Sequence, residues 1–433
     1  MFCLVDCNNF FVSCERIFRP DLENKPVMVL SNNDGCVISR SNEVKKLGIK
    51  MGIPLFKVKS LVEQGKVHVF SANFELYSDI SCRIMESLKS FTENLQVYSI
   101  DEAFLDLSKT RLPLTHEGAK IHRTLRKHLS IPVSIGIAST KTLCKIAAFL
   151  AKQKNTAVIV LSSEDEIMAA LAQVPVSEVW GVGLQLNAVL RYEGIDTALD
   201  LVRMNDCYVR QRYGIQLLRT LHELRGIRCS EIDNSYEPRK SIISSRSFGR
   251  KVTSFTELAE AVSTHISKSC AKLRSENLQA QSLSVYIRAN RFTAAYFKGY
   301  KTFKLPYPTN DTRILIQNAE DILKKLFIPN LLYDKCGIEL FDLSNQTSLQ
   351  YNLFEKSFLP AEILRKENLF RCIDTLNKKD VNGKVFVAAC GTTNNRIQQN
   401  SRSWQSKSNM KSACYTTNLS QLPFAFVIPC FAQ

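Results

Sequence analysis

Two carboxylates stand side by side within an otherwise apolar, β-branched and aromatic stretch, residues 97–107. Asp101 and Glu102 lie in its middle, which predicts a strand-turn-strand hairpin with the acids at its tip. A second short apolar strand, residues 2–5, runs directly into Asp6. The three acids are therefore candidates to converge, and converging carboxylates repel one another unless cations lie between them. Oxygen ligands without a nearby His or Cys pair favour magnesium over zinc, and two magnesium ions are typical of phosphoryl transfer.

The alternative is that the hairpin acids are solvated turn residues and that Asp6 is a strand-end cap, because surface carboxylates are common. The lysines of the N-terminal half favour the first interpretation. Lys45 follows another strand-like run, and residues 133–138 indicate a strand that leads into a lysine-rich helix. Lys145 and Lys152 are seven residues apart, or two helical turns, so both project from one helix face. Such a stripe is often only solvated, but lysines behind metal-bound carboxylates match the needs of a nucleoside triphosphate.

An ordered series of motifs runs through this half of the chain: Asp6 with Asn8-x-Phe10-Phe11, then residues 30–38, then residues 46–54, then Tyr98-Ser99-Ile100-Asp101-Glu102-Ala103-Phe104. An Asp-Glu pair alone is a weak signal. The series as a whole resembles the Y-family DNA polymerases, and within them the UmuC group, which are catalytic subunits of translesion polymerases. The resemblance runs from residue 1 to about residue 422, nearly the whole chain.

The resemblance implies a set of site residues. Two magnesium ions would be held by the three acids and a backbone carbonyl: Asp6, Asp101, Glu102 and Cys7. The incoming nucleotide would meet three triphosphate contacts and a steric gate whose ring excludes a ribose 2′-hydroxyl: Asn42, Lys45, Lys152 and Phe11. A loose site with small fingers selects nucleotides less stringently by induced fit, so the resemblance implies an error-prone enzyme that copies damaged templates.

The charge of the chain also points to a nucleic-acid partner. The formal net charge is +16, and residues 239–304 alone carry thirteen Lys and Arg against three Glu, or +10. A solvated basic surface is the alternative, but so uneven a balance across a domain-sized segment favours a polyanion. The resemblance places a DNA-gripping little finger domain here, and its expected DNA contacts are Arg246, Arg250, Arg288 and Arg291.

A smaller glycine-containing module lies before that segment. Gly181 and Gly183 precede an apolar helical pattern, and a helix start with exposed backbone N–H groups suits one phosphate. The module resembles the helix-hairpin-helix of the family's thumb, which would make both glycines DNA contacts. The basic residues usual after the second glycine are missing, since Leu184-Gln185-Leu186 stand there instead.

Other global features exclude several classes of protein. A chain of 433 residues predicts two to four domains. The fourteen cysteines are scattered without a C-x-x-C pair, so neither a disulfide framework nor a zinc site is indicated. No apolar run resembles a signal peptide or is long enough to span a bilayer. We therefore expect a cytoplasmic protein without a membrane partner, associated with the nucleoid when active.

The C-terminal region has its own signals. Gln350, Leu353 and Phe354 resemble the peptide by which these polymerases dock on the sliding clamp, although short motifs also recur by chance. Residues 374–377 and 410–417 resemble a region specific to the UmuC group. From residue 391 to the end there is no Asp or Glu, which predicts a flexible tail that orders on a partner.

We therefore expect an α/β (α+β multidomain) right-hand polymerase. Its parts would be a ferredoxin-like palm with inserted small fingers, a thumb, an α+β little finger and the C-terminal region, at residues 1–161 (fingers at about 31–71), 162–233, 239–343 and 344–433. The implied partners are primer-template DNA, deoxyribonucleoside triphosphates, a UmuD′-like dimer, RecA and the sliding clamp, in SOS-type damage tolerance. The alternatives are a two-metal nuclease or nucleotide cyclase on a similar palm, and a catalytically inactive DNA-binding subunit.

Overall fold

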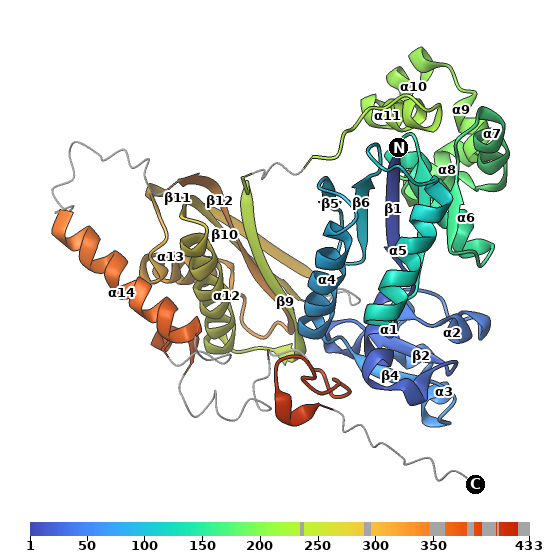
Figure 1. Ribbon diagram of the computed structural model, residues 1–433. Helices are drawn as coiled ribbons and strands as arrows, with labels where there is room; N and C mark the ends of the chain where they lie inside the picture. The colour runs from blue at the N-terminus through green and yellow to red at the C-terminus, as the bar shows by residue number, and fades with distance from the viewer. Residues whose placement is uncertain are drawn as a thin grey trace, which may run out of the picture. The chain divides into compact units, whose positions relative to one another are not determined.

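The structure is a computed structural model that describes residues 1–233, 238–289, 296–345, 360–378, 385–391, 404 and 407–422. It divides into two compact units (Figure 1). Unit 1 comprises Met1–Tyr236 together with Asn409–Gln433, and unit 2 comprises Glu237–Ser408. No helix in the described ranges combines the length and the apolar character needed to cross a membrane.

The segment expected to form the palm contains a five-stranded sheet of order β5-β6-β1-β7-β8. The strands are β1 Phe2–Cys7, β5 Leu95–Val97, β6 Glu102–Asp106, β7 Val133–Ala138 and β8 Val158–Val160. β1 lies in the centre, antiparallel to β6 and β7. Phe2 and Leu4 enter one core and Cys3 and Val5 the other, so β1 is covered on both faces. The pairing of β5 with β6 confirms the expected acidic hairpin.

Helices cover both faces of this palm sheet. On the face of Phe2 and Leu4, the sheet packs against the helix that follows β7, α6 Lys141–Gln153. On the face of Cys3 and Val5, it packs against three helices: α1 Phe10–Phe18, α4 Phe74–Lys89 and α5 Leu114–Leu129. Thr140 caps α6 by accepting a hydrogen bond from the Leu143 amide. The small Gly136 of β7 lets α6 approach closely, because a Cβ there would lie 2.1 Å from the Cys144 carbonyl oxygen. The strand and lysine-rich helix expected from the sequence are therefore confirmed.

The segment expected to form the fingers contains a three-stranded sheet of order β3-β2-β4. Its elements are β2 Val27–Leu30, β3 Val37–Arg40, α2 Asn42–Lys46, α3 Lys59–Glu63 and β4 His68–Ser71. The expected insertion began at about residue 31, yet β2 pairs with both other strands of this sheet. The three-stranded sheet therefore begins at Val27, before the expected start of the insertion. The sequence of an apolar strand does not show which sheet the strand joins.

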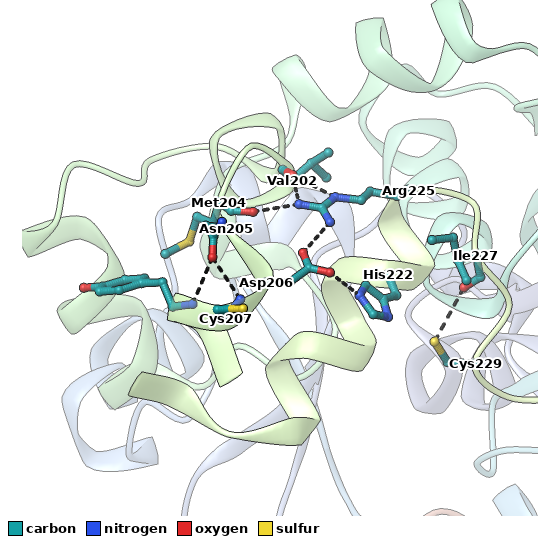
Figure 2. Close-up of polar contacts among 10 residues, drawn as sticks. Val202, Met204, Asn205, Asp206, Cys207, His222, Arg225, Ile227 and Cys229 are labelled. Atoms are coloured by element: carbon teal, nitrogen blue, oxygen red, sulfur yellow. Dashed lines mark hydrogen bonds and ion pairs between the residues drawn. The ribbon is translucent and has the colours of Figure 1, made fainter. Parts of the chain in front are cut away.

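The thumb segment is helical. Its helices are α7 Glu164–Gln173, α8 Leu184–Tyr192, α9 Ala198–Val202, α10 Asp206–Tyr213 and α11 Ile215–Leu224. Figure 2 shows how Asp206 joins the last two: its carboxylate contacts His222 Nε2 at 2.8 Å and accepts from Arg225 Nη1 at 2.5 Å. Arg225 also donates to the carbonyls of Val202 and Met204, so one guanidinium links the ends of three helices.

Unit 2 has a four-stranded antiparallel sheet of order β11-β10-β12-β9 (Figure 1). Its elements are β9 Ser241–Val252, α12 Phe255–Ser275, β10 Leu278–Ala289, β11 Phe297–Thr309, α13 Thr312–Leu326, β12 Tyr333–Asn345 and α14 Pro360–Lys378. α12 and α13 pack on one face of this sheet. α14 joins them through Asp374, which accepts two hydrogen bonds from Arg274 of α12, at 2.7 and 2.9 Å.

Six short 3-10 helices complete the described secondary structure: η1 Pro20–Leu22, η2 Asn32–Asp34, η3 Leu55–Lys57, η4 Val176–Glu178, η5 Ala388–Cys390 and η6 Leu419–Gln421. The last belongs to the tail expected to stay flexible. Residues 409–422 instead pack within unit 1, where the Met410 amide donates to Ser71 Oγ at 3.0 Å. This part of the expectation is wrong because composition does not show that an edge strand of the same chain offers pairing groups.

Candidate active site

Asp6 and Glu102 lie directly opposite each other on neighbouring strands. They are partners in the antiparallel register of β1 and β6. Directly opposite residues share a face of the sheet, and both side chains point toward α6, where each meets a lysine. The two acids thus converge as the sequence predicts.

The expected lysine stripe provides the countercharges. Lys152 Nζ lies 2.6 Å from Asp6 Oδ2, and Lys145 Nζ lies 3.0 and 2.9 Å from the two oxygens of Glu102. Burial raises the pKa of Asp6 to about 6, against the lowering effect of Lys152, and the neighbouring Glu102 adds to the rise. The electrostatics of the site therefore favour additional positive charge beside these acids.

Asp101 is held next to them by the backbone. The Cys7 amide donates to the Asp101 carbonyl at 2.9 Å, and Asp101 Oδ1 accepts from Ser99 Oγ at 2.6 Å. Within the described ranges, no three His, Cys, Asp or Glu side chains are already grouped as a metal site. The donor set nevertheless fits magnesium, because it consists of carboxylate oxygens, and the lysine ammonium groups stand where cations are favoured.

Lys145 is a site residue that sequence reasoning did not assign. Its ammonium lies 4.5 Å from the ring centroid of Tyr98 and 5.6 Å from that of Trp180, in addition to its ion pair with Glu102. Trp180 Nε1 in turn donates to Tyr98 Oη at 3.1 Å. Cations over aromatic faces are held electrostatically, so the Lys145 ammonium is held both by the aromatic rings and by the Glu102 carboxylate. Its spacing from Lys152 was the signal available in the sequence.

The expected triphosphate contacts gather beside the acids. Asn42 Oδ1 accepts from Lys45 Nζ at 3.2 Å and from Asn9 Nδ2 at 3.2 Å, which links α2 to the start of α1. Burial lowers the pKa of Lys45, and the charges of Arg40 and Lys152 lower it further. Three cations therefore lie close enough to repel one another, an arrangement that an anion relieves. Arg40 is the member that sequence reasoning missed.

Phe11 lies in a cluster of aromatic rings. It stacks on Tyr77 with ring centroids 4.6 Å apart and meets Phe74 edge-on at 5.9 Å. Both partners belong to the first turn of α4. The position of the Phe11 ring is thus set by α4 as well as by its own helix.

The arginines expected to contact DNA lie on different faces of the unit 2 sheet. Arg288 of β10 is on the face that α12 and α13 do not cover, and its Nε donates to Asp334 at 2.8 Å. Arg246 of β9 lies opposite Cys336, which belongs to the core beneath the helices. Two exposed residues that register with β10, Lys298 and Tyr300, share the face of Arg288.

The remaining expected contacts are more varied. Arg250 is exposed and donates to Glu257 of α12 at 3.3 Å. Gly181 has a φ of +92°, which favours glycine, and Gly183 precedes α8 as its N-cap. Leu184 after it is 91% exposed, so the hairpin offers backbone groups and an apolar side chain but no cation at this position. Outside the described residues lie Arg291, Gln350, Leu353 and Phe354.

Known families and proteins match nearly the whole chain. The impB/mucB/samB family matches residues 5–148 and its C-terminal domain matches residues 239–353, while a domain of unknown function matches residues 367–425. Protein UmuC of Salmonella typhimurium is 39% identical over 98% of this chain and 99% of its own. Protein ImpB of the same species is 37% identical over the same shares. DNA polymerase IV of Bacillus velezensis is 26% identical over 87% of this chain and 89% of its own.

Solved structures show the same fold. A Y-family DNA polymerase chimera of Dbh and Dpo4 superposes with a TM-score of 0.65 at 22% identity, covering 79% of this chain and 98% of that one. An insertion ternary complex of Dbh DNA polymerase has a TM-score of 0.54 and covers 78% and 98%. These matches confirm the expected mixed α/β polymerase architecture. The chain belongs to the impB/mucB/samB family and is a UmuC-type DNA polymerase of the Y family.

Proposed function

We propose that the chain is an error-prone translesion DNA polymerase that adds deoxyribonucleotides to a primer 3′-hydroxyl, with Asp6, Asp101 and Glu102 as its catalytic acids. The observation that carries these roles is the register that sets Asp6 opposite Glu102, with Lys152 and Lys145 behind them. Two acids that face each other and are each paired with a lysine are better suited to binding a metal-bound triphosphate than to capping a strand end. The UmuC, ImpB and DNA polymerase IV relatives make the nuclease and inactive-subunit alternatives unfavoured.

Divalent-metal catalysis follows in general terms from membership in this family, and two magnesium ions are our specific proposal. Asp6, Asp101, Glu102 and the Cys7 carbonyl would hold them. When bound, they supply activation of the primer hydroxyl and neutralisation of the triphosphate and departing pyrophosphate. The protein's own contribution is to keep the carboxylates opposed across β1 and β6.

The other residues orient the nucleotide and the DNA. Lys45, Lys152 and Asn42 contact the triphosphate in this proposal, Arg40 adds charge beside them, and the Phe11 ring excludes a ribose 2′-hydroxyl. The residues expected to bind DNA are Gly181, Gly183, Arg246, Arg250, Arg288 and Arg291, of which Arg246 lies on the side of the sheet that faces the helices. Only the phosphate backbone is read by such contacts, which suits a polymerase that accepts any sequence.

A primer-extension assay tests the function directly. A labelled primer annealed to a template with one abasic site is incubated with magnesium and the four deoxynucleotides, with and without a UmuD′-like dimer and RecA filaments. We expect extension on undamaged template, and extension past the lesion when both partners are present. Shortening of the primer would support a nuclease instead, and an unchanged primer in every condition would support an inactive subunit.

The proposed partners follow from the UmuC group and from the C-terminal motif. We propose the UmuD′-like dimer, RecA and the sliding clamp as partners, in a cytoplasmic enzyme that joins the nucleoid when active. Gln350 would occupy a polar pocket of the clamp, with Leu353 and Phe354 as apolar anchors.

Replacing Leu353 and Phe354 together by alanine tests the clamp proposal. We expect clamp-stimulated synthesis to be lost and unstimulated extension to be unchanged, because two such anchors carry most of a short peptide's binding energy. Titration of the variant with clamp measures this, and undiminished clamp binding would show that docking occurs elsewhere.

A further inference from the structure

Residues 409–422, which we call the C-terminal strap, bind the edge of the fingers sheet. The Ser71 amide at the end of β4 donates to the Met410 carbonyl at 3.0 Å, and Ser71 forms an isolated parallel bridge with Lys411. The Asn409 amide donates to Asp34 Oδ2 at 3.1 Å, and the Met410 side chain packs into the fingers core. The strap therefore continues the sheet past its edge strand.

The strap continues onto the two helices that carry the Phe11 cluster. Ser412 Oγ accepts from Asn73 Nδ2 at 2.9 Å, and Asn73 is the cap of α4, accepting at Oδ1 from the Leu76 amide. Ser412 Oγ also donates to Glu15 Oε1 of α1 at 3.1 Å. One hydroxyl thus joins the start of α4 to the middle of α1.

Glu15 is a buried carboxylate that connects Ser412 to the aromatic cluster of Phe11, the proposed steric gate. Its relative exposure is 0%, and burial raises its pKa against its two hydroxyl donors. The second donor is Tyr77 Oη, at 2.7 Å. Tyr77 is itself 0% exposed, and its ring is the one that stacks on Phe11. Ser412 and Tyr77 therefore share a single carboxylate oxygen.

Two further contacts hold the strap in this place. Tyr415 stacks on Phe18 of α1 with ring centroids 4.5 Å apart, and Lys411 Nζ lies 3.1 Å from Glu75 of α4. The strap has no acid of its own, and it lies against acids of the fingers and palm. Its composition is thus complementary to the surface that it covers.

We propose that Ser412 is a positioning residue for sugar selection: through Glu15 and Tyr77 it fixes the ring of Phe11, so that the C-terminal strap forms the outer support of the steric gate. The inference rests on the proposed role of Phe11 in excluding ribonucleotides. It gives part of the matched domain of unknown function a task inside the polymerase, independent of any partner.

The test compares full-length variants in single-nucleotide incorporation without partner proteins, with kcat and KM measured for a deoxyribonucleotide and the matching ribonucleotide. Ser412→Ala removes only the shared hydroxyl. Ser420→Ala is the matched control, because Ser420 lies in the same strap and its hydroxyl donates to Asn418 of the strap itself, at 2.7 Å. Phe11→Ala is the reference for a lost gate, and Ser412→Thr restores a hydroxyl.

We expect Ser412→Ala to lower discrimination against the ribonucleotide by about threefold to tenfold, the range for the loss of one hydrogen bond of ordinary strength. The change should appear as a lower KM for the ribonucleotide, with Ser420→Ala unchanged and partial recovery in Ser412→Thr. Equal losses for both sugars, or unchanged discrimination in Ser412→Ala beside a clear effect of Phe11→Ala, would overturn the inference. If Phe11→Ala itself leaves discrimination unchanged, the gate assignment fails and the inference falls with it.

Discussion

At the scale of single residues, the structure gives Phe11 neighbours that only folding brings together. The two aromatic rings that it contacts, those of Phe74 and Tyr77, lie more than sixty positions away in the chain. The position of Phe11 after Asp6 was available from the motif, and the convergence of Asp6 and Glu102 was expected because they lie at a strand end and at a hairpin tip. The support behind the ring, Glu15 and Tyr77, was not predictable, because buried polar partners have no local sequence pattern.

Replacing Phe11 by alanine should raise ribonucleotide incorporation much more than it lowers deoxyribonucleotide incorporation. Forcing a hydroxyl against a fixed ring costs about 1–3 kcal/mol, so discrimination should fall by about tenfold to a hundredfold. Steady-state kcat/KM for the two sugars measures the effect. Equal losses for both would show that Phe11 serves only the aromatic cluster.

At the scale of elements, the strand β7 and the helix α6 were predictable from the run at residues 133–138 and the lysine spacing that follows it. The sheet membership of β2 and the side of the sheet on which Arg246 lies were not. Both depend on pairing between segments far apart in the chain, and a shift of one residue in register exchanges the two faces of a strand.

The close approach of α6 to β7 predicts the effect of Gly136→Ala. The added Cβ would lie 2.1 Å from the Cys144 carbonyl oxygen and 2.4 Å from the Ala148 amide nitrogen, both backbone atoms. Moving α6 would cost about 1–3 kcal/mol or more and would displace Lys145 and Lys152, so both stability and incorporation should fall. Urea unfolding measures the first; Gly183→Ala, which meets no atom within 4 Å, is the control. Identical unfolding midpoints would contradict the packing described.

His265 of α12 should make the stability of unit 2 sensitive to acid. Burial, together with the charges of Arg246 and Lys268, lowers its pKa from 6.5 to about 4. Below pH 6.5, His265 binds a proton in the unfolded chain but stays neutral in the folded chain. The free energy of unfolding therefore decreases as the pH falls from 6.5 toward 4. At pH 4.5 this loss amounts to about 2–3 kcal/mol.

His265→Leu should therefore reduce the difference in unfolding free energy between pH 7 and pH 4.5. Urea titrations at the two pH values measure it, with His128→Leu as the control because that side chain is exposed. An acid sensitivity that persists unchanged in His265→Leu would place its origin in another group.

At the scale of the whole molecule, the chain leaves unit 1 after residue 236, builds unit 2, and returns to unit 1 with the strap. The motifs and the basic segment predict four consecutive segments, and the structure divides the chain into two compact units. The return of the strap could not be predicted, because a polar sequence without acids carries the composition of a tail. The acids Asp34, Glu15 and Glu75 of its docking surface contribute to its packing, together with the apolar contacts of Met410 and Tyr415.

The central claim is that the three acids at the ends of β1 and β6 carry out nucleotide transfer. Asp101→Asn tests it most directly, in a single-turnover primer-extension assay paired with a DNA-binding titration. Asp106→Asn is the control, since Asp106 lies at the far end of β6, the strand that follows Asp101, opposite Phe2. Loss of one metal ligand removes several kcal/mol of transition-state stabilisation, so incorporation should fall by about a hundredfold or more while DNA binding and the control stay near normal. Near-normal extension by Asp101→Asn would contradict the account.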